Sequence, residues 1–305
     1  MLTRKTKLLL MKILSLFSVV RGYNIPIIVL AQYLSSIFIL APERRALDVL
    51  LDWRLFIIVF VSTLTIASGY IINNFYDSEK DLINRPSKSM LDRLVSQKTK
   101  LQVYFGLNFL ATALAYIISW RAALFFAVYI FLIWFYSHKL KKYPMIGNLT
   151  ASLLAVLPFF GILLYFKNFY HVIFAHATFL FLLILIREMI KDLENIKGDV
   201  ANNYQTIPVR FGEKISKQLI TVLTISTVIP VFILIDKYDV GYMDIYFYIS
   251  LMVLIFFLLK LWKSQTQSEY LQLHNILKSL IVAGVFCIVL IDPVVLIHGR
   301  SLLKI

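Results

Sequence analysis

Long apolar segments separated by short polar stretches recur along the whole chain. Nine of them are candidates to cross a bilayer, for which a helix needs about 20 apolar residues. They cover residues 17–40, 55–75, 101–119, 122–137, 146–166, 170–190, 215–235, 242–262 and 276–298. Strands of a membrane barrel are about ten residues long and alternate in polarity, whereas these segments are longer and do not alternate. Because backbone polar groups in lipid must be satisfied within each segment, the pattern predicts an all-α bundle of about nine transmembrane helices.

The composition excludes the soluble classes of protein. Hydrophobic residues make up 60% of the 305 residues and charged residues 16%, and the mean hydropathy is +0.79. A soluble domain is about half apolar and a quarter charged. A single cysteine, Cys287, also excludes a fold built on disulfides. We therefore treat residues 1–305 as one integral-membrane domain.

The distribution of charge orients this bundle. The formal net charge is +14, but the basic residues are spread between the spans and no nucleic-acid-binding module is visible, so we expect no nucleic-acid partner. Most of the 31 Lys and Arg residues fall in connections on the same side as the N-terminus. The excess of positive charge on cytoplasmic loops predicts a cytoplasmic N-terminus, in what we expect to be the cell (inner) membrane. We interpret the opening stretch, 1–20, as retained because it lacks a small-x-small cleavage site.

A first polar cluster follows the second span. Asn73, Asp77 and Asp81 are spaced four residues apart, so a helix that continues from the span places all three on one face. Stacked carboxylates repel one another unless a cation lies between them, and Mg²⁺ is usually bound by one or two carboxylates together with substrate phosphates. The alternative is an ordinary hydrated helix end whose acidic residues are placed by chance.

A second cluster leaves the sixth span on the same side of the membrane. Asp192, Asn195 and Asp199 again share one helical stripe. Two such stripes facing each other across a cavity would form a site for a diphosphate bridged by Mg²⁺ ions. The candidate metal ligands are Asn73, Asp77, Asp81, Asp192, Asn195 and Asp199.

Other polar residues are candidates to bind substrate. Five basic residues could neutralise a departing diphosphate, namely Arg85, Lys139, Lys142, Lys191 and Arg210. Arg21 and Asn24 lie within the first span, where polar groups are costly unless they face the interior of the bundle. We expect Arg21 and Asn24 to help bind a substrate, either the donor or the acceptor of a transferred group. The alternative for Arg21 is a side chain that snorkels to the interface.

The two clusters together resemble the UbiA-type intramembrane prenyltransferases. The first motif of that family reads Asn-x-x-x-Asp-x-x-x-Asp and is complete here, whereas the second, Lys-Asp-x-x-Asp-x-x-x-Asp, carries Asn195 where the family commonly has Asp. An asparagine can still ligate a metal through its carbonyl oxygen, though more weakly. Further matches are Arg21-Gly22-Tyr23-Asn24, Tyr136-Ser137 with Lys139, Gly147-Asn148, and the segment 206–212. The run from Arg187 to Gly212 is most similar to the geranylgeranylglycerol-phosphate geranylgeranyltransferase branch.

The resemblance implies a Mg²⁺-dependent enzyme that transfers an isoprenyl group from an allylic diphosphate, with its active site facing the cytoplasm. It also implies that four aspartates are catalytic, namely Asp77, Asp81, Asp192 and Asp199. The expected donor is geranylgeranyl diphosphate and the expected acceptor geranylgeranylglyceryl phosphate. An aromatic precursor of quinones (4-hydroxybenzoate, dihydroxynaphthoate or homogentisate) is the alternative acceptor, and membrane lipids surround the protein. An ion-coupled transporter is the non-enzyme alternative, although the acidic residues lie at the membrane face instead of the midplane. A CDP-alcohol phosphotransferase would require an Asp-Gly step, which the chain lacks.

Overall fold

The computed structural model describes residues 4–294, and in that part of the chain the regular structure is helical throughout. The α-helices are α1 (Arg4–Val19), α2 (Ile25–Ser35), α3 (Ala46–Leu50), α4 (Trp53–Tyr76), α5 (Ser78–Asn84), α6 (Pro86–Asp92), α7 (Gln97–Ile118), α8 (Trp120–His138), α9 (Ile146–Phe166), α10 (His171–Glu194), α11 (Ile196–Ala201), α12 (Ile207–Ser226), α13 (Val228–Lys237), α14 (Met243–Lys263) and α15 (Gln267–Cys287). A π-helix (Ser36–Leu40) extends α2, and 3₁₀ turns follow α8 (Leu140–Lys142) and α15 (Ile288–Ile291).

Eight helical segments of the described residues are long and apolar enough to cross a membrane, and two shorter apolar segments, Leu10–Val19 and Ile25–Leu40, accompany them. The predicted all-α membrane bundle is confirmed. One boundary differs, because the expected first span, 17–40, is broken by a turn at residues 20–24, where Arg21 has a positive φ of 50°. The last residues of the expected span 276–298 lie outside the described part.

Local sequence signals explain where several helices begin. The side chain of Asp52 accepts hydrogen bonds from two backbone N–H groups in the first turn of α4. Thr266 and Glu269 form a reciprocal capping box at the start of α15. Such caps satisfy N–H groups that a helix cannot pair internally.

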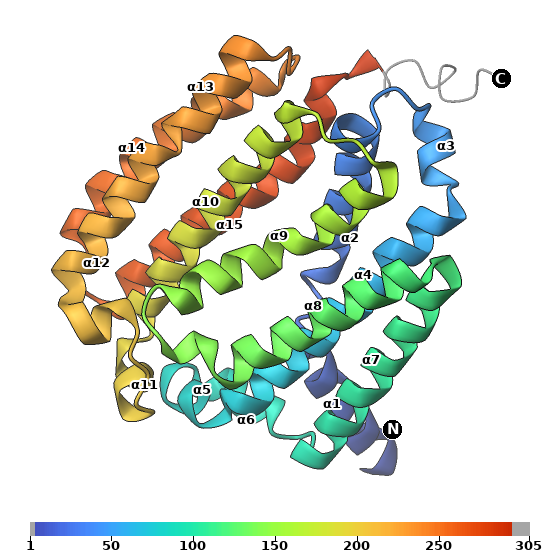
Figure 1. Cartoon of the computed structure of the whole chain (residues 1–305). Helices are drawn as coiled ribbons and strands as arrows, with labels where there is room; N and C mark the ends of the chain where they lie inside the picture. The colour runs from blue at the N-terminus through green and yellow to red at the C-terminus, as the bar shows by residue number, and fades with distance from the viewer. Residues whose placement is uncertain (1–3, 295–305) are drawn as a thin grey trace.

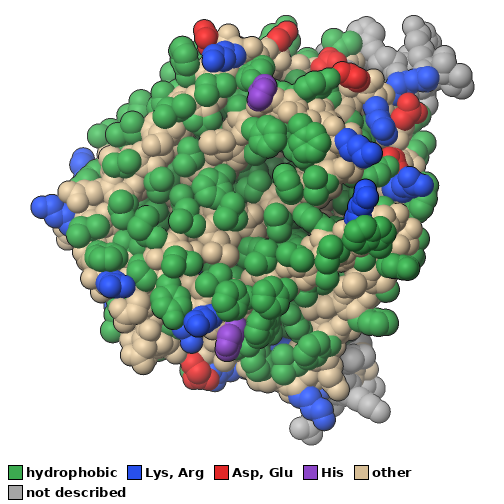
Figure 2. Space-filling view, viewed as in Figure 1, with side chains coloured by type: hydrophobic (Ala, Val, Ile, Leu, Met, Phe, Trp, Pro, Cys, Tyr) green, Lys and Arg blue, Asp and Glu red, His purple; other side chains and the backbone are tan. Residues whose placement is uncertain are grey.

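The long helices form two packed groups. One apolar cluster gathers α10 with α12, α14 and α15, and a second gathers α4 with α7, α8 and α9. The short helices α5, α6 and α11 lie together at one end of the bundle, whereas α3 lies at the opposite end (Figure 1). Hydrophobic side chains cover most of the face seen in Figure 2, and the charged side chains lie mainly around its margin. This is the surface expected of a protein whose sides contact lipid.

Candidate functional site

A small polar cavity lies at the end of the bundle that carries α5 and α11, and both acidic motifs contribute to it. Its volume is about 40 Å³, and we call it the polar pocket. It is lined by Arg21, Asn73, Asp77, Lys80, Asp81, Arg85, Tyr136, Lys141, Gly147, Asn148, Glu188, Lys191, Asp192 and Asn195. Residues more than a hundred positions apart in the sequence therefore meet at one site.

The first motif enters the pocket across a helix junction. Helix α4 ends at Tyr76 and α5 begins at Ser78, but the N–H of Asp77 still donates to the carbonyl of Asn73 (2.9 Å) and the N–H of Asp81 to that of Asp77 (2.8 Å). These i to i−4 bonds preserve the helical stripe. Asn73, Asp77 and Asp81 consequently all line the pocket, as their spacing predicts.

Asp77 is buried, which differs from the hydrated helix end considered as an alternative. Only 7% of the residue is exposed. Its Oδ1 accepts hydrogen bonds from Lys141 Nζ (2.7 Å) and Tyr204 Oη (3.0 Å). Burial by itself would raise the pKa of Asp77, but the ammonium groups of Lys141 and Lys80 outweigh it and lower that pKa to about 2. Asp77 is therefore a carboxylate held in place by cations.

Asp81 has a different electrostatic environment. Burial raises the pKa of its carboxyl, and the negative charge of Asp77 raises it further. Arg85 and Lys80 offset part of this effect. The first motif thus concentrates negative charge that favours the approach of a cation.

The second motif supplies Asp192 and Asn195 from the end of α10. Asp192 Oδ2 accepts a hydrogen bond from Asn148 Nδ2 at 2.8 Å, which ties α10 to α9. The Nδ2 of Asn195 donates to the carbonyl of Lys191 at 2.7 Å. This bond fixes the amide so that its nitrogen is already used within its own helix.

Asp199, the last residue of the second motif, does not line the polar pocket. Its side chain is fully buried, forms an ion pair with Lys80 (2.6 Å) and accepts a hydrogen bond from Thr206 (3.2 Å). Burial raises the pKa of Asp199, and Lys80 partly offsets this. In this structure Asp199 joins α11 to α5, and its metal-binding role stays a prediction.

Three of the predicted cationic residues line the pocket. Arg85 donates to Glu194 at 2.8 Å and Lys191 to Glu188 at 2.8 Å. The guanidinium of Arg21 lies 5.0 Å from the ring centroid of Tyr70. The pocket therefore combines positive and negative side chains, as a site for a metal-bound anion requires.

The other predicted binding residues do not line this pocket. Lys139, Lys142 and Arg210 are exposed, and Arg210 stacks on the neighbouring Phe211. Asn24 is half-buried at the start of α2. Substrate binding by these four residues remains a prediction.

Sequence reasoning missed two lysines that the structure places in the pocket, Lys80 and Lys141. Lys141 belongs to a run of basic residues that look equivalent in the sequence. The 3₁₀ turn at Leu140–Lys142 directs Lys141 inward and leaves its neighbours Lys139 and Lys142 in solvent. Lys80 could have been found from its spacing, because it lies three residues after Asp77 and therefore on the same face of a helix. Asn148, which donates to Asp192, is part of the Gly147-Asn148 match, but its spacing does not reveal this contact.

The donor set of the pocket suits Mg²⁺ shared with a phosphate ligand. Within residues 4–294 no three His, Cys, Asp or Glu side chains lie close enough together to form a metal cage of their own. The carboxylates of Asp77, Asp81 and Asp192 nevertheless line one cavity with the amide of Asn73. Hard oxygen donors with incomplete coordination are typical of Mg²⁺ sites completed by substrate phosphates.

Two apolar cavities continue from the polar pocket into the bundle. The first, which we call the central cavity, has a volume of about 330 Å³ and shares with the pocket Arg21, Asn73, Tyr136, Glu188 and Lys191. The second, which we call the distal cavity, has a volume of about 120 Å³ and shares with the central cavity Ala31, Phe159, Leu180, Ile281 and Val285. Together they form a path from charged to apolar surroundings.

Known proteins resemble this chain in sequence. A model of the UbiA prenyltransferase family matches residues 29–277. A digeranylgeranylglyceryl phosphate synthase of Thermococcus sibiricus is 32% identical over 180 residues, which are 57% of this chain and 61% of that relative. A protein of the same name from Sulfurisphaera tokodaii is 27% identical over 228 residues, covering 73% of this chain and 80% of the relative. The resemblance expected from the motifs is confirmed.

Solved structures share the fold. One, from a study of digeranylgeranylglyceryl phosphate synthase in membranes, matches with a TM-score of 0.68 and 22% identity, and covers 91% of this chain and 97% of that one. A UbiA homolog from Archaeoglobus fulgidus bound to DMAPP and Mg²⁺ matches with a TM-score of 0.67 and 16% identity, over 90% of this chain and 99% of the homolog.

Proposed function

The chain belongs to the UbiA prenyltransferase family, and we propose that it transfers the isoprenyl group of an allylic diphosphate, geranylgeranyl diphosphate, to geranylgeranylglyceryl phosphate in a Mg²⁺-dependent reaction. The observation that carries the proposal is the junction of a charged pocket with an apolar cavity, which share five lining residues. A prenyl diphosphate likewise has a charged head, which would fit the pocket, and a hydrocarbon tail, which would fit the apolar cavity.

The polar pocket suits the head of the donor. Lys141, Lys191, Arg21 and Arg85 line it with positive charge that can bind diphosphate oxygens. Oxygen atoms of Asn73, Asp77, Asp81, Asp192 and Asn195 would hold Mg²⁺. When bound, Mg²⁺ supplies positive charge that stabilises the leaving diphosphate.

The central cavity suits the reactive carbon and the tail. As the allylic C–O bond breaks, positive charge develops on the hydrocarbon, and water would capture it. Tyr70, Tyr129, Tyr136 and Phe159 bring aromatic rings to the cavity wall. Ring faces attract a cation, and the mainly apolar lining excludes water.

The names of the relatives and the charge of the pocket support this acceptor. Curated relatives carry the name digeranylgeranylglyceryl phosphate synthase, and adding one geranylgeranyl group to geranylgeranylglyceryl phosphate gives the product in that name. The hydroxyl oxygen of the acceptor bonds to the allylic carbon, diphosphate leaves, and the hydroxyl proton is released. A phosphate-bearing acceptor also suits the basic surroundings of the pocket, which we place at the cytoplasmic face of the membrane.

A product assay with purified protein tests this proposal. Geranylgeranyl diphosphate and Mg²⁺ are offered with geranylgeranylglyceryl phosphate or with a panel of aromatic acids, and products are identified by mass spectrometry. We expect digeranylgeranylglyceryl phosphate. Transfer only to an aromatic acid would overturn the acceptor and move the enzyme to quinone synthesis. A failure to release diphosphate from any allylic donor would overturn the prenyl transfer itself and favour a transporter.

A further inference from the structure

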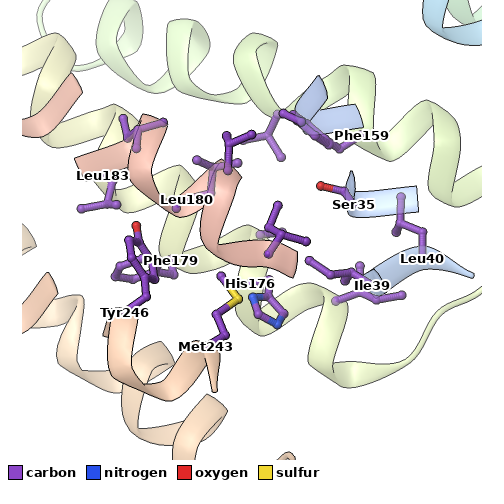
Figure 3. Close-up of a pocket in the computed structure, with 18 of the residues that line it drawn as sticks. Ser35, Ile39, Leu40, Phe159, His176, Phe179, Leu180, Leu183, Met243 and Tyr246 are labelled. Carbon is purple, nitrogen blue, oxygen red and sulfur yellow. The ribbon is translucent and has the colours of Figure 1, made fainter. Parts of the chain in front are cut away.

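The distal cavity lies far from the charged residues and is almost entirely apolar. Its walls come from α2, α9, α10, α14 and α15, and Figure 3 shows several of the side chains that surround it. The polar side chains among them are Ser35, His176 and Tyr246, and the hydroxyl of Tyr246 donates to the carbonyl of Leu280. No residue of either acidic motif contributes, so the cavity has no part in binding the diphosphate.

The distal cavity continues the path that begins at the polar pocket. Ala31, Phe159 and Leu180 belong to its wall and also to the wall of the central cavity. A chain whose head lies in the polar pocket and whose first units fill the central cavity would therefore enter the distal cavity next.

Helix α10 gives the length of this path. Asp192 lies in the polar pocket, and Ile173 is the residue of α10 on the distal cavity that is farthest from it. Their separation of nineteen positions corresponds to about 28 Å along the helix axis at 1.5 Å per residue. A geranylgeranyl chain has sixteen main-chain carbons and extends about 20 Å at about 1.25 Å per carbon, given ordinary C–C bond lengths. The remainder is about the length of a diphosphate group.

The end of the cavity opposes a longer chain. The π-helix residues Ile39 and Leu40 and the side chain of Met243 border it together with His176 (Figure 3). Additional isoprene units would have to displace these side chains or press against the imidazole, and covering a polar group with hydrocarbon is unfavourable when it gains no hydrogen bond.

We propose that the distal cavity receives the last isoprene units of the donor and thereby selects a chain of four units, with Ala177 and His176 as specificity-determining residues. This inference rests on the proposed function, because it concerns the donor of that reaction.

Ala177→Phe tests the proposal by filling the distal cavity. Ala177 is half-buried and lines the distal but not the central cavity. We expect kcat/KM for geranylgeranyl diphosphate to fall about tenfold or more, because a hydrophobic pocket discriminates by such factors for even one methylene. The value for geranyl diphosphate, which ends within the central cavity, should remain unchanged. Ala113→Phe is the matched control, since Ala113 is exposed on α7 and borders neither cavity.

His176→Ala provides a second test that does not depend on fitting a larger side chain. Removing the imidazole adds space at this part of the cavity, so the preference for a five-unit donor over the four-unit donor should rise about tenfold. An unchanged ratio, or an equal loss for all donors, would overturn the proposal. If the wild-type protein uses two-, three- and four-unit donors with equal kcat/KM, the chain-length proposal is wrong, but the proposed function stands. If it releases diphosphate from none of these donors, the proposed function itself is wrong.

Discussion

At the residue scale, the polar pocket is defined by the way that its carboxylates are already paired. Asp77 is held by Lys141 and Tyr204, and Asp192 by Asn148. Pairing of this kind lowers the cost of burying a carboxylate and fixes its orientation before any ligand arrives. Asn195 is the exception, because its amide replaces a carboxylate and is bonded to its own helix.

Replacing Asn195 with aspartate tests whether this position reaches the metal. Asn195→Asp removes the donor to the Lys191 carbonyl and buries a second acceptor beside it, so the metal-free protein should become less stable. A carboxylate is a stronger Mg²⁺ ligand than an amide, so the rise in Tm on adding Mg²⁺ and diphosphate should become larger. Thermal unfolding across a Mg²⁺ titration measures both effects.

Asn202→Asp is the matched control for this substitution. Asn202 forms the same type of bond, from its Nδ2 to the Gly198 carbonyl at 2.9 Å, but it does not line the polar pocket. It should lose stability without gaining a Mg²⁺ response. If Asn195→Asp behaves like Asn202→Asp, Asn195 is not a metal ligand.

At the scale of elements, α5 and α11 close the charged end of the bundle. The Lys80–Asp199 ion pair joins them, and the N–H of Gly198 donates to Asn84 Oδ1 at 3.0 Å. A Cβ at residue 198 would collide with the amide of the Asn84 side chain, so a larger residue there would displace Asn84 and disturb this hydrogen bond. These contacts hold two segments that contribute to the site from distant parts of the sequence.

Breaking this ion pair should destabilise the protein markedly. Lys80→Met leaves Asp199 buried without its cation, which typically costs about 3–5 kcal/mol. The double variant Lys80→Met/Asp199→Asn removes the stranded charge and should recover part of the loss. Arg93→Met is the comparison, because its partner Glu79 is exposed and a surface pair contributes at most about 1 kcal/mol. Equal stability of the single and double Lys80 variants in denaturation experiments would contradict a buried ion pair.

The elements also show what the sequence can and cannot predict. Hydropathy locates the spans because lipid requires apolar side chains along the whole length of each one. The i, i+4 spacing places Asn73, Asp77 and Asp81 on one face of a helix. Spacing could not distinguish Lys141 from Lys139 and Lys142, because a short turn decides which lysine points inward. It also could not show that Lys80 reaches Asp199, since that contact depends on how α5 and α11 pack.

At the scale of the whole molecule, polar chemistry lies at one end and an apolar path leads away from it. The short helices and both acidic motifs share that end, while α3 lies at the other (Figure 1). The distribution of Lys and Arg predicts that the charged end faces the cytoplasm.

Labelling of single cysteines measures this orientation. In a Cys287→Ser background, Ser87→Cys lies exposed at the charged end and Glu43→Cys is exposed near α3. In intact cells, a membrane-impermeant thiol reagent should label Glu43→Cys at once and Ser87→Cys only after the membrane is opened. The reverse pattern would place the site outside the cell.

The most direct test of the account is the Mg²⁺-dependent release of diphosphate from geranylgeranyl diphosphate by the purified protein. Wild-type protein should release diphosphate only when Mg²⁺ is present. Asp77→Asn should lower the rate about 100-fold or more, because the groups that stabilise a leaving anion commonly contribute that much, whereas Glu79→Gln, outside the pocket, should leave it unchanged. A wild-type rate in Asp77→Asn, or no release by the wild-type protein, would contradict the assignment of the polar pocket as the site of prenyl transfer.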